Sequence, residues 1–118
     1  MKTILIVEDI DINIDLLTQI LEDEYQLLIA KDGPQAVEYT TQNNPDLVLM
    51  DISLPLMDGY EAARRLRSQY PTLPIIGLSA HAMTGDAEKA ISAGCSDYLT
   101  KPVDETLLLG KIRAFLDI

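Results

Sequence analysis

Short apolar runs recur along the chain at a nearly regular interval. An uninterrupted apolar run of about four residues is typical of a parallel strand that is covered on both faces. We therefore expect five strands, and they are Ile4–Val7, Leu27–Ala30, Leu47–Met50, Ile75–Leu78 and Tyr98–Thr100. The fourth run contains Gly77, and the fifth is the shortest of the set.

Helical periodicity fills the intervals between these runs. The apolar residues of the first interval follow the spacing of one helix face, and we expect them to be buried. They are Leu16, Leu17, Ile20 and Leu21. Ile12 and Ile14 then lie on the two flanks of this stripe. The last helix begins near Asp104, and its apolar face consists of Leu107, Leu108, Ile112, Phe115 and Leu116.

Cap residues mark the ends of the other helices. Asp32 and Asp58 each precede a Gln or a Glu by three residues, which is the spacing of a capping box and predicts a helix start. Residues 43–45, with two Asn and a Pro, end the first of these helices. Thr84 can cap the fourth helix of the chain, and Gly94 stands where a left-handed residue would end it.

Five strands thus alternate with five helices, and the connections between them are short. This alternation predicts an α/β fold, a doubly wound five-stranded parallel sheet with helices on both faces. The sequence contains no internal repeat, low-complexity stretch or linker, so residues 1–118 are expected to form one domain.

Acidic residues outnumber basic residues by 19 to 9, which gives a formal net charge of −10. This balance argues against nucleic acid or an anionic membrane as the main partner, because both attract clustered Lys and Arg. The apolar runs are too short for a membrane span or a signal peptide. A single cysteine, Cys95, excludes an intramolecular disulfide and a Cys-rich zinc site. We expect a small, soluble, cytoplasmic domain.

Polar residues follow the predicted strands at their carboxyl ends. Glu8 and Asp9 come after the first strand, Asp51 after the third, Ser79 after the fourth and Lys101 after the fifth. In an open α/β sheet, ligands bind beyond the carboxyl ends of the strands, at the point where the strand order reverses. We therefore expect three carboxylates, a hydroxyl and an ammonium group to converge at one edge of the sheet.

This set of groups has a defined chemistry. Neighbouring carboxylates repel one another unless a cation neutralises them. Hard oxygen ligands without His or Cys favour Mg²⁺, which accepts one or two carboxylates and keeps several waters. Positions would remain open for phosphoryl oxygens, with Lys101 and Ser79 placed to contact the others. The set suits a carboxylate nucleophile that accepts a phosphoryl group.

These motifs resemble those of response regulator receiver domains of the CheY-like type, and the likeness covers essentially the whole chain. It is carried by Glu8-Asp9, by the segment 45–59 with Asp51 near its centre, by Ser79-Ala80 and by Lys101-Pro102. The resemblance implies a flavodoxin-like sheet with the strand order 2-1-3-4-5.

Carried over by position, the resemblance implies that Asp51 is the phosphorylated residue. Glu8 and Asp9 would hold Mg²⁺ together with Asp51 and the backbone carbonyl of Ser53. Lys101 would pair with the phosphoryl group or with Asp51 itself.

Two further positions match the conformational switch of this family. Ser79 would be the hydroxyl that follows the phosphoryl group, and Tyr98 the aromatic residue that alternates between exposed and buried rotamers. The bond between Lys101 and Pro102 is expected to be cis, since X-Pro bonds tolerate that isomer. The sequence departs from the commonest pattern in Glu8, where Asp is usual, and in Ser79, where Thr is more frequent.

Two hypotheses concern residues beside this set. His81, two residues after Ser79, is expected with Ser53 to tune the lifetime of phospho-Asp51 by shielding or orienting the hydrolytic water. Ile12, an apolar residue outside the buried stripe, is expected to dock the helices of a phosphodonor together with Pro102.

The resemblance implies a signalling switch and not an enzyme with an external substrate. A sensor histidine kinase or a histidine phosphotransfer protein would donate the phosphoryl group to Asp51 in a Mg²⁺-dependent reaction. The face formed by the fourth helix, fifth strand and fifth helix would then bind a downstream protein. We expect a monomer or weak dimer and a stand-alone receiver, although a domain of a hybrid kinase would show the same pattern.

Other functions fit only parts of this pattern. A phosphorylation-independent interaction module would not need the carboxylates and Lys101. A Mg²⁺-dependent phosphohydrolase with an aspartyl nucleophile commonly has a second Asp two residues later, where this chain has Ser53, and it needs a substrate-holding cap. A nucleotide-binding domain would need a Gly-rich phosphate loop after the first strand, and the sequence has none there.

Overall fold

Strands and helices alternate along the chain in the computed structural model, which describes residues 1–52, 54, 58–79 and 86–116. The strands are β1 (Thr3–Val7), β2 (Gln26–Ala30), β3 (Leu47–Asp51), β4 (Ile75–Ser79) and β5 (Asp97–Thr100). The helices are α1 (Asp11–Leu21), α2 (Gly33–Asn43), α3 (Gly59–Gln69), α4 (Asp86–Ser92) and α5 (Glu105–Leu116).

The five strands form one parallel sheet in the order β2-β1-β3-β4-β5, which confirms the predicted fold. From β1 the chain proceeds first to β2 on one side and later to β3 on the other. The strand order therefore reverses between β1 and β3, and the carboxyl ends of these two strands border the expected ligand site.

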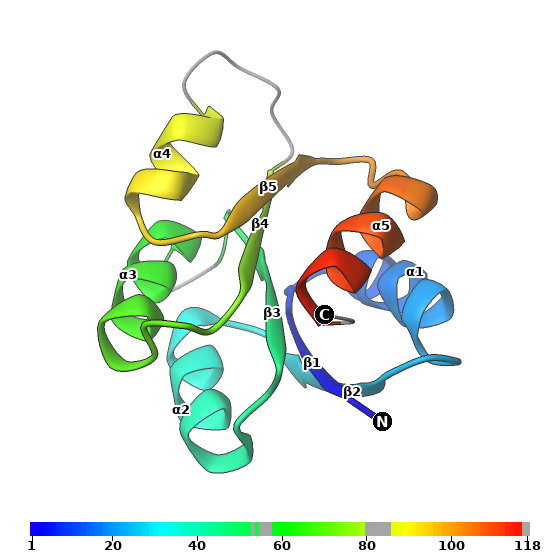
Figure 1. The fold of residues 1–118 in the computed structure, drawn as a ribbon, viewed down its shortest axis with the longest axis horizontal. Helices are drawn as coiled ribbons and strands as arrows, with labels where there is room; N and C mark the ends of the chain where they lie inside the picture. Colours follow the sequence, from blue (N-terminus) through cyan, green and yellow to red (C-terminus); the bar gives the residue numbers. More distant parts are fainter. Residues whose placement is uncertain (53, 55–57, 80–85, 117–118) are drawn as a thin grey trace.

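Helices cover both faces of the sheet. Figure 1 shows α1 and α5 on one side, with α2, α3 and α4 on the other. Successive residues of β1 point to opposite faces, so Ile4 and Ile6 pack with the first group of helices and Leu5 and Val7 with the second. The strands β3 and β4 are buried along their whole length, which explains why they appear in the sequence as continuous apolar runs.

The first helix differs from the sequence prediction in the face that it buries. Ile14, Leu17 and Leu21 are buried, whereas Leu16 is 46% exposed and Ile20 is partly buried. Because successive residues are about 100° apart around a helix, Leu16 and Ile14 do not share a face. The prediction that Leu16 belongs to the core was wrong, and Ile14 takes that place.

A similar difference occurs in α5. Its buried residues, Leu108, Ile112 and Leu116, lie at intervals of four, and Phe115 is partly buried. Leu107 is 51% exposed, so its predicted place in the apolar face was wrong. One helix turn presents only one of two adjacent leucines to the sheet, and here that residue is Leu108.

The helix ends agree with the predicted caps. The Asp32 carboxylate accepts a hydrogen bond from the Gln35 N–H at 2.8 Å, and Asp58 accepts one from the Glu61 N–H at 2.9 Å. After α2, Asn44 is left-handed with a φ of 47°, and after α4, Gly94 has a φ of 115°. The predicted cap Thr84 lies outside the described residues.

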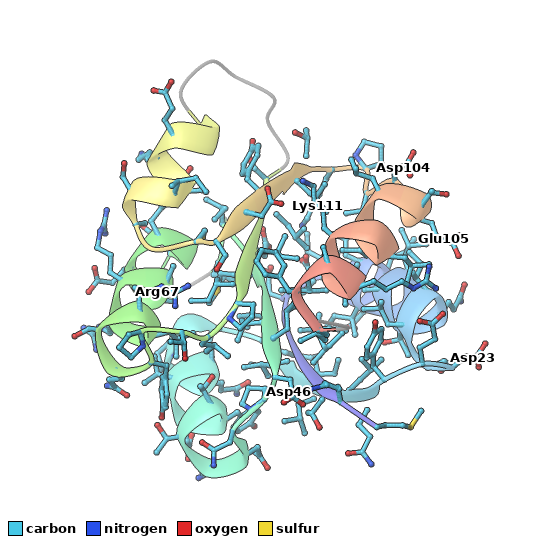
Figure 2. The ribbon with its side chains drawn as sticks, viewed as in Figure 1. Asp23, Asp46, Arg67, Asp104, Glu105 and Lys111 are labelled. Carbon is cyan, nitrogen blue, oxygen red and sulfur yellow. The ribbon has the colours of Figure 1, made fainter. Side chains whose placement is uncertain are left out.

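Arg67 connects α3 to the turn between α4 and β5 (Figure 2). Its guanidinium donates to the carbonyl oxygens of Gly94 at 2.9 Å, Tyr70 at 3.0 Å and Pro71 at 2.9 Å, and to the Ser96 hydroxyl at 3.1 Å. The Ser96 hydroxyl in turn accepts the N–H of the first residue of β4. The turn is thereby fixed against both α3 and the sheet.

Cys95 lies in this turn and packs against β4. A Cβ at Gly77 would lie 3.3 Å from the Cys95 sulfur, so the glycine in β4 gives the thiol room. The pKa of the Cys95 thiol is raised to about 11. Burial is the larger cause and raises the pKa, and the charge of the neighbouring Arg67 offsets only part of that rise. The thiol is therefore protonated at neutral pH.

Replacing Arg67 with Ala removes four hydrogen bonds and should lower the free energy of unfolding by about 2 kcal/mol. Arg64 is a matched control, since it is an exposed arginine of the same helix that pairs with Glu61 at 3.4 Å. Arg64→Ala should change the free energy of unfolding by less than about 0.5 kcal/mol. Urea unfolding followed by circular dichroism measures both, and equally small losses would contradict the anchoring role of Arg67.

Candidate functional site

The predicted polar residues meet at the carboxyl ends of the strands. Glu8 and Asp9 follow β1, Asp51 ends β3, Ser79 ends β4 and Lys101 follows β5. Glu8, Asp51 and Ser79 are buried, whereas Asp9 is exposed. The parallel order of the strands is what brings together residues so distant in the sequence.

Lys101 contacts two of the three carboxylates. Its Nζ lies 2.7 Å from Glu8 Oε2 and 3.4 Å from Asp51 Oδ1, and its side chain is 18% exposed. The backbone places it there, because the Lys101 N–H donates to the Ser79 carbonyl at 2.6 Å and extends the pairing of β5 with β4. The bond between Lys101 and Pro102 is cis, as the resemblance implied.

Glu8 is completely buried, and both of its oxygens accept hydrogen bonds. Oε2 accepts from Lys101, while Oε1 accepts from the Ile10 N–H at 3.3 Å and the Asn13 side-chain amide at 3.5 Å. Ile10 is the N-cap of α1 and supplies no side-chain cap. The carboxylate of Glu8 therefore ties the start of α1 to the site. Asn13 was missed as a site residue, because an Asn in a first helix turn is no signal by itself.

The three carboxylates form a candidate metal centre. In the described part of the chain, Glu8, Asp9 and Asp51 each offer one oxygen, and these oxygens lie within 4.8 Å of one another. Opposite oxygens around an octahedral Mg²⁺ are about 4 Å apart, so small side-chain rotations bring them into range. Three hard oxygen donors at this spacing fit Mg²⁺.

The predicted switch residues occupy adjacent strands. Ser79 ends β4, and Tyr98 is partly buried in β5, opposite Gly77. Tyr98 lines a surface groove of about 320 Å³ together with Leu107 and Lys111. Lys111, which Figure 2 labels on α5, also pairs with Asp97 of β5 at 2.8 Å. Movement of the Tyr98 side chain remains a prediction.

An apolar surface lies beside the acidic cluster. Ile12 is 74% exposed, as predicted, and Pro102 is also exposed. Leu16 and Pro102 line a small pocket of about 70 Å³ that reaches the side chains of Glu8 and Lys101. Docking of a partner on this surface remains a prediction.

Two predicted site residues, Ser53 and His81, lie outside the described residues. Their expected roles, the Ser53 carbonyl as a metal ligand and both residues in the lifetime of a phosphorylated state, remain predictions.

Gly59 was missed as a site residue, although its position supports Asp51. A Cβ there would collide with the Asp51 carbonyl oxygen and would lie 2.5 Å from Ile52 Cα. The Gly59 N–H also donates to the Ile52 carbonyl at 2.8 Å. The absence of a side chain lets α3 begin directly against the end of β3, which fixes the backbone that carries Asp51.

Within the ranges that the structure describes, no helix combines the length and the apolar character needed to cross a membrane.

The sequence and the structure are similar to those of known signalling proteins. Residues 4–113 match the family described as "Response regulator receiver domain". The response regulator PleD of Caulobacter vibrioides is 36% identical over an alignment of 114 residues that covers 94% of this chain and 25% of PleD. The chain thus spans about a quarter of the length of that relative.

Solved structures of receiver domains are also similar to this chain. The receiver domain of the sensor histidine kinase PA1611 from Pseudomonas aeruginosa has a TM-score of 0.91 and 36% identity, over 99% of this chain and 98% of that one. That structure contains a magnesium ion coordinated in its active-site cleft. The receiver domain of Ssk1 from Saccharomyces cerevisiae, solved in complex with the histidine phosphotransfer protein Ypd1, has a TM-score of 0.90 and 33% identity, over 97% of this chain and 88% of that one.

Substituting Gly59 with Ala should lower the free energy of unfolding by about 1–3 kcal/mol, because the backbone of Asp51 and Ile52 must move. Gly110 in α5 is the matched control, since a Cβ there meets no atom within 4 Å. Gly110→Ala should raise stability by about 0.5–1 kcal/mol. Chemical denaturation of the two variants measures the difference, and a stabilised Gly59→Ala protein would refute the close approach.

Proposed function

The chain belongs to the response regulator receiver domain family of two-component signalling, and on that premise we propose that Asp51 is its phosphoacceptor. The observation that carries the proposal is the position of this carboxylate. Asp51 is buried at the end of β3, lies 3.4 Å from the Lys101 ammonium and shares the acidic cluster with Glu8 and Asp9.

The proposed reaction transfers a phosphoryl group from a histidine to a carboxylate. An Asp51 oxygen attacks phosphorus, and the bond from phosphorus to the histidine nitrogen breaks with its electron pair going to that nitrogen. The imidazole leaves as the neutral base, because its other ring nitrogen already carries a proton. Lys101 neutralises negative charge that gathers on the phosphoryl oxygens. Glu8 and Asp9, with Asp51, are the residues that would hold Mg²⁺, which when bound supplies further positive charge to those oxygens.

The output would be a change in shape and not the turnover of an external substrate. The hydroxyl of Ser79 would shift toward the phosphoryl group, and Tyr98 would follow by turning into the space beside β4. The surface around Tyr98, Leu107 and Lys111 would then differ between the two states, and it is the proposed contact for a downstream protein. Selection of an active conformation that the unphosphorylated protein already populates to a small extent gives the same outcome.

The proposed donor is a phosphohistidine on a kinase or on a histidine phosphotransfer protein. The similarity to a receiver domain of a histidine kinase, and to Ssk1 in complex with a phosphotransfer protein, supports this class. The exposed side chains of Ile12 and Pro102 beside the acidic cluster offer the donor an apolar contact. Leu16, exposed one turn beyond Ile12, extends that contact surface.

Incubation with acetyl phosphate should add one phosphoryl group to the wild-type protein in the presence of Mg²⁺ and none when Mg²⁺ is chelated. Asp51→Asn should remain unmodified, because an amide oxygen is a poor nucleophile. Asp23→Asn alters an exposed aspartate after α1 and should be modified like the wild type. Intact mass spectrometry measures the product, and phosphorylation of Asp51→Asn would exclude the proposed acceptor.

Ile12→Asp should slow transfer from a phosphorylated histidine phosphotransfer protein by about tenfold or more, because it places a charge in an apolar contact. The same variant should react normally with acetyl phosphate. Ile91→Asp is the matched control, since Ile91 is 49% exposed on α4. Radiolabel transfer assays measure the rates, and equal rates for Ile12→Asp and Ile91→Asp would remove Ile12 from the docking surface.

A further inference from the structure

Asn13 contacts the acidic cluster from the first turn of α1. Its side-chain amide lies 3.5 Å from Glu8 Oε1, whereas Lys101 contacts the other carboxylate oxygen, Oε2. It also lines the small pocket that Glu8 and Lys101 line. No role follows for Asn13 from the proposed transfer chemistry, since it is neither a carboxylate nor a cation.

The two oxygens of Glu8 have different partners. Oε2 makes a short contact of 2.7 Å with Lys101, and Oε1 accepts two longer hydrogen bonds, from the Ile10 N–H and from Asn13. Glu8 is completely buried, so a lost donor leaves its carboxylate with one hydrogen bond fewer inside the protein. Without the amide of Asn13, one of the two donors that orient Oε1 would be gone, and the carboxylate could rotate about its last bond.

We propose that Asn13 is a positioning residue that acts through Glu8 and thereby sets the affinity of the acidic cluster for Mg²⁺. The inference rests on the proposed function, in which Glu8 is a metal ligand. Groups that hold metal-ligating side chains in place typically contribute 10–100-fold to metal affinity. The long hydrogen bond of Asn13 and the second donor at Oε1 favour the lower end of that range.

A purely structural role for Asn13 predicts a different result. Ile10 is the N-cap of α1, so Asn13 is not the cap, and Ala has a higher helix propensity than Asn. Loss of the amide would then leave α1 equally stable or more stable, and Mg²⁺ affinity would not change. The two roles are therefore separated by a binding measurement that involves no phosphoryl transfer.

The experiment is a calorimetric titration of the purified protein with MgCl₂. Asn13→Ala and Asn13→Leu should both bind Mg²⁺ about tenfold more weakly than the wild type, because both lack the amide donor. Asn13→Gln retains the donor and should recover most of the affinity. Asn43→Ala is the matched control, since the Asn43 amide donates to the Tyr39 carbonyl at 3.0 Å at the far end of α2, and its affinity should equal that of the wild type.

The possible outcomes separate the two proposals. If the wild type binds Mg²⁺ and both Asn13→Ala and Asn13→Leu bind it equally well, the positioning role is overturned and the proposed function stands. If the wild type itself does not bind Mg²⁺, the Mg²⁺-dependent function fails and the inference fails with it. Circular dichroism of each variant shows whether a weaker affinity comes from a folded protein. If Asn13→Ala is unfolded, Asn13→Leu, which has the branched shape of Asn, supplies the test instead.

Discussion

The ion pair between Lys101 and Glu8 is the contact on which the site depends. It joins side chains 93 positions apart in the sequence, one after β1 and the other after β5, and it compensates a completely buried carboxylate. A buried charge of this kind is costly unless it is paired and hydrogen-bonded, and removal of either partner leaves the other uncompensated. Asp51 lies 3.4 Å from the same ammonium group, so the contact that makes Glu8 tolerable in the fold also places a cation beside the proposed phosphoacceptor.

The balance of charge in the site remains negative after this pairing. Among the described residues, the ammonium group of Lys101 pairs with two of the three carboxylates of Glu8, Asp9 and Asp51, so an added cation lowers their mutual repulsion. The identity of Glu8 matters here. In the sequence, a Glu in place of the more frequent Asp keeps a carboxylate at this position. In the structure, one oxygen of that carboxylate already accepts a hydrogen bond from Lys101, and the other accepts from donors at the start of α1. Under the proposed function, Lys101 therefore has to be shared between Glu8 and the phosphoryl group.

The sequence was a good guide to the sheet and a poorer guide to the helices. Buried parallel strands appear as continuous apolar runs, and their carboxyl ends identify Glu8, Asp51, Ser79 and Lys101 without further information. Helix α1 carries more apolar residues than one face can bury, and only its packing on the sheet decides which of them are buried. The sequence therefore predicted a buried Leu16, whereas Ile14 is the buried residue. Asn13 and Gly59 were missed for another reason. Asn13 depends on its contact with the Glu8 carboxylate, and Gly59 on its closeness to the Asp51 carbonyl. Neither residue type indicates, from the sequence alone, which residue lies next to it in the fold.

The two leucines that were wrongly predicted to be buried both lie near the loop that carries Lys101. Leu16 of α1 and Pro102 line the small pocket at the acidic cluster, and Leu107 of α5 lines the groove that contains Tyr98 and again Pro102. Single exposed leucines are ordinary on a protein surface, but these two border the same cis-proline loop. The surface proposed for the donor and the surface proposed for the downstream partner therefore meet at Pro102, directly after the lysine that contacts Asp51. Under the proposed function, in which Lys101 is shared between Glu8 and a phosphoryl group, a movement of Lys101 would reach both proposed surfaces through the residue next to it.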